Sequence, residues 1–176
     1  MKLHIGCGPV HLPGWINIDH GATSSADIRL DITQGLPYDS ASIDLIYSEH
    51  FIEHFTVEQG VALFRDFHRV LKPGGVVRTA TPDMRFILKR YFFMWRRQEW
   101  LTRYGYEYIQ TRAEMVNIGF REWGHQYIYD EEELVRRLKE AGFQRTAREK
   151  LNRSRHADLR NLETRKDSTL IVEATR

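Results

Sequence analysis

The 176-residue sequence has little cysteine, little net charge and no long apolar run. Its one cysteine, Cys7, excludes an intramolecular disulfide and any zinc site built from cysteines alone. The longest hydrophobic cluster, Tyr91–Trp95, is far shorter than the roughly 20 residues that a bilayer-spanning helix needs. No signal-peptide pattern precedes the first strand-like residues, Lys2–Ile5. Together with the single cysteine, these absences predict a cytoplasmic protein.

The formal net charge of +2 hides an uneven distribution along the chain. Residues 1–83 carry 6 Lys/Arg and 10 Asp/Glu, whereas residues 84–125 carry 8 and 4. The middle segment also holds 11 of the 21 aromatic residues. A chain of this length and hydrophobic content can bury one sizeable core. We therefore predict a single domain over residues 1–176, with a basic and aromatic segment at 84–125.

Strand-like runs alternate with helical patterns, which predicts an α/β fold with a mainly parallel sheet. The runs fit seven strands: Lys2–Ile5, Trp15–Asp19, Asp27–Leu30, Ile43–Ser48, Val76–Ala80, one near 144–150, and Thr169–Ala174. A helix is expected at about 57–71, capped by Thr56 and ended by Lys72–Gly75. A second helix is expected to begin after Asp130 and to stop at Gly142.

Residues 84–125 are expected to form a helical insertion after the fifth strand, covering the substrate. One helical stripe is predicted to carry its large apolar side chains, namely Met84, Ile87, Leu88, Tyr91, Trp95 and Leu101. The arginines around this stripe have three interpretations that the sequence leaves open. They face solvent on a cap helix, bind an anionic substrate, or dock on an anionic membrane.

Ligands in open α/β sheets bind beyond the carboxyl ends of the strands. Gly6-Cys7-Gly8 follows the first strand directly, and glycines there let backbone N–H groups approach a ligand. Asp19 ends the second run, where its carboxylate can accept both hydroxyls of a ribose. Asp31 ends the third run and can accept from an exocyclic amine, with Ile32 against a flat ring. The order of these residues predicts a nucleoside-binding site.

These residues and several later motifs resemble the class I S-adenosylmethionine-dependent methyltransferases over most of the chain. The later motifs are Leu36-Pro37, Ser42–Ile46, Phe51–His54, Phe67–Gly75 and Glu140–Phe143. The resemblance implies a Rossmann-like, seven-stranded, mainly parallel sheet with its last strand antiparallel. The opening G-C-G…G-W-I-N-I-D is similar, more narrowly, to small bacterial methyltransferases often associated with surface-polysaccharide pathways.

The resemblance also implies S-adenosylmethionine as the cofactor and assigns residues to it. Gly6, Cys7 and Gly8 would line its methionine end, and Asp19 would hold the ribose. His20 and Ile32 would flank the adenine, and Asp31 would meet its amino group. Ser48 and Glu49, at the end of the fourth strand, would lie near the sulfonium.

Two connections are too short for the helices that this family usually has. Only Pro9–Gly14 separates the first two strands, and only His20–Ala26 separates the second from the third. We therefore expect a domain trimmed of its first two helices. The same short spacing argues against a nicotinamide enzyme, whose glycine motif opens a helix with the acidic residue about 20 positions later.

The segment His50-Phe51-Ile52-Glu53-His54 has three interpretations. As H-x-x-E-H it matches a zinc peptidase pattern, which would make the chain a hydrolase. It also resembles the E-x-x-E-H motif by which some O-methylating relatives bind a divalent ion, with His50 in place of the first glutamate. In the third, His54 packs at a strand–helix corner or acts as a general base. We assign no metal site and take His54, His50 and His125 as the candidates for the chemistry.

The acceptor is expected to be a hydroxyl. The sequence contains no N/D-P-P-Y motif of amino-methylating DNA enzymes, and Cys7 belongs to the cofactor loop. A small metabolite or a sugar or glycan-type substrate is predicted, with an anionic one favoured by the basic insertion. Nucleic acid is disfavoured by the charge of only +2 and the lack of an RNA-binding motif. The oligomeric state is left open, and a non-catalytic, cofactor-binding regulatory module remains the alternative.

Overall fold

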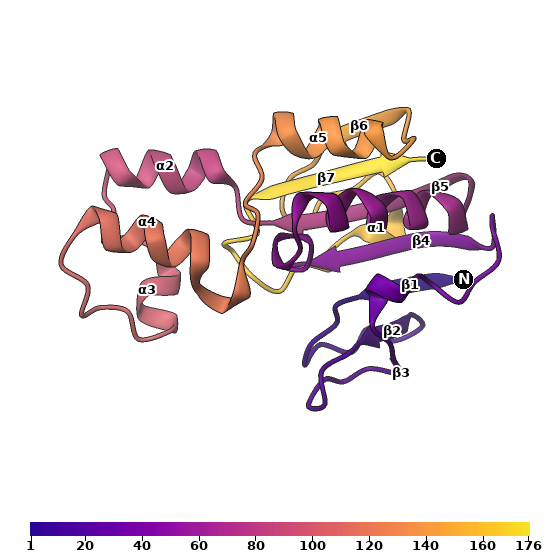
Figure 1. Ribbon diagram of the computed structural model, residues 1–176, viewed down its shortest axis with the longest axis horizontal. Coiled ribbons are helices and arrows are strands. Elements are labelled where there is room, and N and C mark those ends of the chain that lie inside the picture. Colours follow the sequence, from indigo (N-terminus) through magenta and orange to yellow (C-terminus); the bar gives the residue numbers. More distant parts are fainter.

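In the computed structural model, which describes residues 1–176, seven strands form one sheet (Figure 1). The strands are β1 Lys2–Ile5, β2 Ile16–Asp19, β3 Ile28–Arg29, β4 Ile43–Glu49, β5 Leu71–Thr81, β6 Arg145–Arg148 and β7 Leu170–Thr175. Their order is β3-β2-β1-β4-β5-β7-β6, and β7 runs antiparallel to both of its neighbours. This confirms the predicted Rossmann-like sheet with its last strand antiparallel.

Helices are absent from the connections β1–β2 and β2–β3, as the short spacings predict. The α-helices are α1 Val57–Val70, α2 Met84–Phe92, α3 Glu99–Arg103, α4 Arg112–Arg121 and α5 Glu131–Glu140. Four 3₁₀ turns complete the fold, namely η1 Ile32–Gln34, η2 Ile52–His54, η3 Glu122–Gly124 and η4 Ala157–Leu159. None of the helices combines the length and the apolar character that crossing a bilayer requires.

Helix α1 begins where the sequence predicts, because Thr56 and Gln59 form a reciprocal capping box. The helix ends at Val70, just before Lys72–Gly75, as predicted, but β5 begins at Leu71 and not at the expected Val76. Lys72–Gly75 therefore lie within β5, where the Gly74 N–H and the Gly75 carbonyl bond to the backbone of Arg176. A Cβ on Gly75 would lie 2.9 Å from the Lys72 carbonyl oxygen, so the tight backbone here requires glycine.

The two faces of the sheet are covered differently. Helices α1 and α5 pack on one face and contribute to the main apolar core of 22 buried residues. On the other face, the connection between β6 and β7, residues 149–169, takes the place of the missing helices. Its Leu159 forms a small apolar cluster with Trp15, Tyr47 and Val76. We call this connection the β6–β7 strap.

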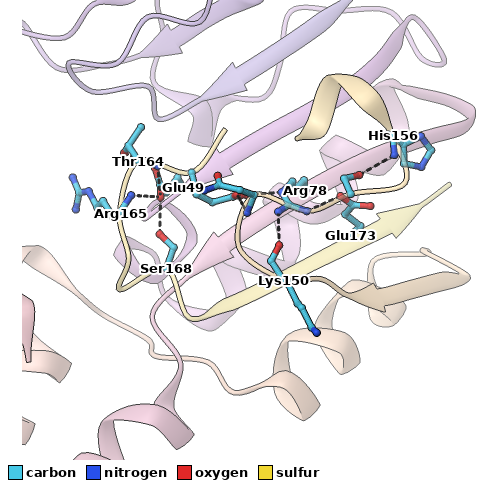
Figure 2. A network of polar contacts seen from close by, with 11 residues as sticks. Glu49, Arg78, Lys150, His156, Thr164, Arg165, Ser168 and Glu173 are labelled. Carbon is cyan, nitrogen blue, oxygen red and sulfur yellow. Dashed lines mark hydrogen bonds and ion pairs between the residues drawn. The ribbon is translucent and has the colours of Figure 1, made fainter. Parts of the chain in front are cut away.

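A buried ion cluster anchors the strap to the sheet. Arg78 of β5 is completely buried, with Nε 2.6 Å from Glu163 of the strap and Nη1 2.7 Å from Glu173 of β7. Its Nη2 donates to the carbonyl of Lys150, where the strap begins (Figure 2). Burial lowers the pKa of Arg78, but the two carboxylates outweigh it and hold the pKa above its usual range. The cluster attaches the strap to β5 at Lys150, where it begins, and again at Glu163.

The 84–125 segment contains three α-helices rather than one apolar stripe. Helix α2 ends at Phe92, so Trp95 and Leu101 do not continue its face. Only Ile87 of α2 is buried, whereas Leu88 and Tyr91 are exposed, so the predicted stripe is wrong. The apolar periodicity assumed an unbroken helix, but the chain turns after Phe92. A separate buried cluster forms instead from Ile87, Trp100, Leu101, Ile109, Met115 and Ile128.

Arg78→Ala is expected to lower the free energy of unfolding by about 3–5 kcal/mol, because it leaves Glu163 and Glu173 buried without a counter-charge. Urea denaturation measures this loss. The matched control is Arg136→Ala, which removes an exposed ion pair to Glu133 and should cost at most about 1 kcal/mol. Equal losses in the two variants would show that the buried cluster does not stabilise the fold.

Candidate active site

A cavity of about 690 Å³ opens at the carboxyl ends of β1, β2 and β4. This volume lies within the range of small-molecule sites. The predicted cofactor residues that line it are Gly6, Cys7, Gly8, Asp19, His20, Asp31, Ile32 and Glu49. Ser48 is the exception, because it is buried within β4 and does not line the cavity. The sheet therefore brings together nearly all of the residues that the motifs select.

The glycine loop and Asp19 form one hydrogen-bonded unit. The Asp19 carboxylate accepts from the Gly8 N–H at 2.8 Å and from the Gly21 N–H at 2.6 Å. A carboxylate has about four acceptor positions, so acceptor capacity remains for ribose hydroxyls. Gly6 has φ +67°, and a Cβ there would lie 2.3 Å from a ring carbon of Phe51, which also lines the cavity. The loop therefore admits only glycine at this close approach.

Asp31 and His20 lie at the rim of the cavity. Asp31 is exposed and caps η1, accepting from the Thr33 N–H at 3.0 Å and from the Thr33 hydroxyl at 2.7 Å. These hydrogen bonds keep the pKa of Asp31 below its usual range, so the carboxylate is ionised. Ile32 is buried behind it, and the His20 side chain is 85% exposed. An ionised acceptor beside an apolar side chain fits an adenine amino group and ring.

The Cys7 thiol is not set up as a nucleophile. Burial, followed by the nearby Asp19 carboxylate, raises the pKa of Cys7 to about 11. A thiol with this pKa is protonated at neutral pH, and the thiolate is the reactive form. Cys7 therefore contributes apolar surface to the loop, in agreement with its predicted place.

Glu49 has a role that the sequence did not indicate. Its carboxylate accepts from the backbone N–H groups of Thr164 and Arg165 and from the hydroxyls of Thr164 and Ser168 (Figure 2). The hydroxyl contacts are 2.7 and 2.6 Å long. Glu49 therefore holds the distal end of the β6–β7 strap over the cavity, with its acceptor positions largely occupied by the strap.

A second, smaller cavity of about 230 Å³ adjoins the first. Both cavities are lined by His50, His54 and Arg165, so these residues stand at their junction. The insertion contributes four aromatic side chains to the walls of the second cavity, Phe86, Trp100, Tyr104 and Trp123, and the carboxylates of Asp83 and Asp167 also line it. Trp123 has φ +58°, a backbone conformation that is unfavourable for a bulky residue and concentrates at functional sites.

His54 and His125 lie side by side at this junction, although they are far apart in the sequence. Their ring centroids are 5.2 Å apart. The His125 Nδ1 lies 3.0 Å from the carbonyl oxygen of Gly119, which can only accept, so Nδ1 carries the proton. The lone pair is therefore on Nε2. Burial, which outweighs the opposing Gly119 contact, lowers the pKa of His125, so the ring is neutral at pH 7.

Glu53 is fully buried beside these histidines. Its Oε2 accepts from the Thr81 hydroxyl at 2.9 Å, and its Oε1 lies 3.2 Å from the His50 Nδ1. Burial raises the pKa of Glu53, but His50 and His54 outweigh it and keep the pKa below its usual range. The Glu53 carboxylate is thus ionised, and its Oε1, which forms no hydrogen bond, faces His50.

The same region contains a geometrically feasible set of metal ligands. Donor atoms of Glu53, His54 and His125 lie within 4.8 Å of one another. His50, which the H-x-x-E-H pattern requires, is not in this set and has φ +49°, outside any helix. Residues 52–54 form a 3₁₀ turn, whereas the peptidase pattern needs two histidines on one α-helical face. The geometry therefore does not support the zinc peptidase interpretation.

Several lining residues could not be selected from the sequence. Arg103 of α3 and Arg165 of the strap both line the larger cavity, and neither guanidinium has a hydrogen bond or an ion pair within the protein. Leu162 and Phe55 add apolar surface. These residues come from segments whose only sequence signal is a general excess of basic and aromatic residues.

Comparisons with known proteins agree with the type of site that the geometry indicates. The model of a methyltransferase domain family matches residues 13–79. The chain is similar to a solved S-adenosylmethionine-dependent methyltransferase from Archaeoglobus fulgidus, with 13% identity, a TM-score of 0.60, and coverage of 99% of this chain and 85% of that one. No curated protein matches the sequence.

A second similar structure comes from Thermotoga maritima and is described as a methyltransferase, a possible histamine N-methyltransferase. Its identity is 13% and its TM-score 0.56, with 99% of this chain and 81% of that chain covered. At this level of identity the likeness establishes the fold.

Asp19→Ala is expected to weaken the binding of S-adenosylhomocysteine about 10- to 100-fold, because charge-assisted hydrogen bonds of about 1.5–3 kcal/mol are lost. Isothermal titration calorimetry measures the change, with the exposed Asp39→Ala as control. Loss of the ribose contact and loosening of the Gly8 loop could both weaken binding. A 2′-deoxy analogue of S-adenosylhomocysteine distinguishes these two explanations. Wild type should discriminate against this analogue and Asp19→Ala should not. Equal discrimination by both would reject the ribose assignment.

Proposed function

We propose that the chain is a class I S-adenosylmethionine-dependent methyltransferase and that it methylates a hydroxyl of a sugar or glycan-type substrate; its family match and its fold support the first part. The observation that carries this proposal is the pair formed by His54, which lines both cavities, and His125, which lies beside it in the wall of the smaller one. An imidazole at that position can accept the proton that a hydroxyl loses on methylation.

The larger cavity holds the cofactor in this proposal. Asp19 binds the ribose hydroxyls, Asp31 accepts from the adenine amine, and the Gly6–Gly8 backbone lies along the methionine end. S-adenosylmethionine, when bound, supplies the electrophilic methyl group. The strap, held by Glu49 and the Arg78 cluster, closes over this cavity and limits the entry of water.

The smaller cavity orients the acceptor. Its volume of about 230 Å³ is below the usual range for a drug-sized ligand, so it fits a single ring of a larger substrate. Aromatic side chains offer flat apolar faces to such a ring, and Gln98, Asp83 and Thr169 add polar groups. His125 takes the hydroxyl proton on Nε2, with Nδ1–H held by Gly119. His54 lies beside it and positions the hydroxyl at the junction.

Arg165 and Arg103 favour a substrate with an anionic group. Both guanidiniums line the larger cavity and lack an internal counter-charge, and Arg165 also faces the smaller one. Arginine binds phosphate and carboxylate groups in a bidentate manner. A phosphorylated or nucleotide-linked sugar would therefore place its ring in the small cavity and its anionic group against Arg165.

One alternative for the same reaction has a geometric basis. A divalent ion held by Glu53, His54 and His125 would activate the hydroxyl in place of a free base. A chelator would then abolish turnover, and added Mg²⁺ or Zn²⁺ would restore it. Unchanged turnover in the chelator supports the imidazole base.

The alternative that the chain is a non-catalytic regulatory module predicts a different result. It requires tight cofactor binding without turnover on any hydroxylated substrate.

His125→Ala is expected to lower kcat about 10²- to 10⁴-fold, the usual contribution of a general base, while cofactor affinity stays within about twofold. Methyl transfer from radiolabelled cofactor to a panel of sugar phosphates and nucleotide sugars measures kcat. The matched control is the exposed His156→Ala, which should retain wild-type turnover. Wild-type turnover by His125→Ala would remove this residue from the mechanism.

The kcat of the wild-type protein is expected to fall at acidic pH and to stay constant above neutral pH. The pKa of His125 lies below its ordinary value of 6.5, so the neutral base is the major form at pH 7. Protonation removes the base as the pH falls through this lowered pKa. The pH profile of kcat should therefore be flat from about pH 7 upward and fall only below about pH 6.5. A rate still rising between pH 7 and 8 would contradict the assignment.

Arg165→Gln is expected to raise KM for a phosphorylated sugar about 10- to 100-fold, because a charge-assisted contact is lost. KM for the corresponding uncharged sugar should not change. Steady-state kinetics with glucose 1-phosphate and with glucose test this difference. Arg160→Gln on the same strap is the control, since its guanidinium is bonded to the carbonyl of Ser154. An equal rise of KM for both substrates would show that Arg165 does not bind the anionic group.

A further inference from the structure

The turn after α2 exposes an unusual run of apolar side chains. Phe92, Phe93 and Met94 are consecutive and are 65%, 63% and 57% exposed. Leu88 and Tyr91 on the preceding turn of α2 are also exposed, at 42% and 37%. Single exposed apolar residues are ordinary, but a contiguous exposed group marks an interaction surface. We call these five residues the α2 tip.

The α2 tip is flanked along the chain by basic residues. Residues 84–98 contain five basic residues and no Asp or Glu. The basic residues are Arg85, Lys89, Arg90, Arg96 and Arg97, and none of them forms an ion pair. Arg90 and Arg96 lie instead over the rings of Phe86 and Trp95. The surface thus combines exposed apolar side chains with unneutralised cations.

The position of the tip makes it accessible. Helix α2 leaves the end of β5 and runs away from the sheet, so its C-terminal end lies on the side of the insertion remote from the sheet (Figure 1). The chain reverses there, with Met94 at φ +52°. The apolar residues therefore project at the extremity, with basic residues on both sides along the chain.

We propose that the α2 tip docks on an anionic lipid surface. Aromatic and thioether side chains at the tip can enter the boundary between headgroups and acyl chains, while the flanking cations meet anionic headgroups. A nucleic acid would be bound by the cations and could stack bases on Phe93, but the aliphatic and thioether side chains of Leu88 and Met94 would gain little from it. A second copy of the chain would bring the same unneutralised cations together, so charge complementarity favours the lipid.

Docking would couple the surface to the small cavity. Phe86 and Ile87, in the first turn of α2, line that cavity, and Phe92 ends the same helix. A helix of nine residues is about 13 Å long, so the cavity and the docked tip are joined by one short rigid element. The enzyme would then work beside the membrane interface. The docking itself does not depend on which hydroxyl is methylated.

Co-sedimentation with vesicles tests the proposal. Wild-type protein should bind vesicles of phosphatidylcholine with about one-third phosphatidylglycerol and should not bind pure phosphatidylcholine vesicles. A triple variant, Phe92→Ser with Phe93→Ser and Met94→Ser, should bind at least about tenfold more weakly, since its buried apolar area is lost. Arg96→Glu with Arg97→Glu should have a similar effect. The control, Leu151→Ser with Tyr108→Ser, removes exposed apolar side chains elsewhere and should bind as wild type.

Circular dichroism and thermal melting confirm that each variant is folded, and cofactor titration shows that the methyltransferase site is intact. The proposal is overturned if wild type does not bind the anionic vesicles, or if the triple variant binds them equally well. It is also overturned if a single-stranded oligonucleotide binds more tightly than the vesicles. Dimerisation in sedimentation velocity that the triple variant abolishes would assign the tip to self-association instead.

Discussion

The buried contact between Arg78, Glu163 and Glu173 is the interaction on which the site depends. A sheet needs both faces covered, and this chain lacks the first two connecting helices that would cover one of them. The β6–β7 strap replaces them, but its sequence is polar and offers few apolar residues besides Leu159 and Leu162. A fully buried arginine bound to two carboxylates therefore supplies the specific attachment that apolar packing supplies on the opposite face.

The attachment of the strap at Arg78 also determines where the strap residues lie in the candidate active site. Once the strap is attached at Arg78, Glu49 at the end of β4 fixes its distal part through Thr164, Arg165 and Ser168. This places Arg165 at the junction of the two cavities. The charged groups of β4 and β5 thus act on the site by positioning the strap. The residues that contact ligands in our proposal are Asp19, the histidines and the free arginines.

A site residue could be predicted from the sequence when its position depends on nearby residues, and not when it depends on residues far away in the chain. The glycine loop, Asp19 and Asp31 could be selected from the sequence because each directly follows a strand, and parallel strands end at one edge. Ser48 was selected on the same basis but points into the packed sheet, since neighbouring residues of a strand face opposite sides. The stripe in the insertion failed because periodicity cannot show where a helix stops. Arg103 had no local signal.

The sequence by itself determined the α/β class, the order of strands and helices, the trimmed connections and the cofactor loop. These features depend on local patterns, on capping residues such as Thr56 and Asp130, and on short spacings. Only the tertiary structure decided that Arg78 is buried with two carboxylates, that Glu49 holds the strap, and that His54 meets His125. Those contacts join residues separated by about 70 or more positions, and local residue patterns do not specify contacts at such separations.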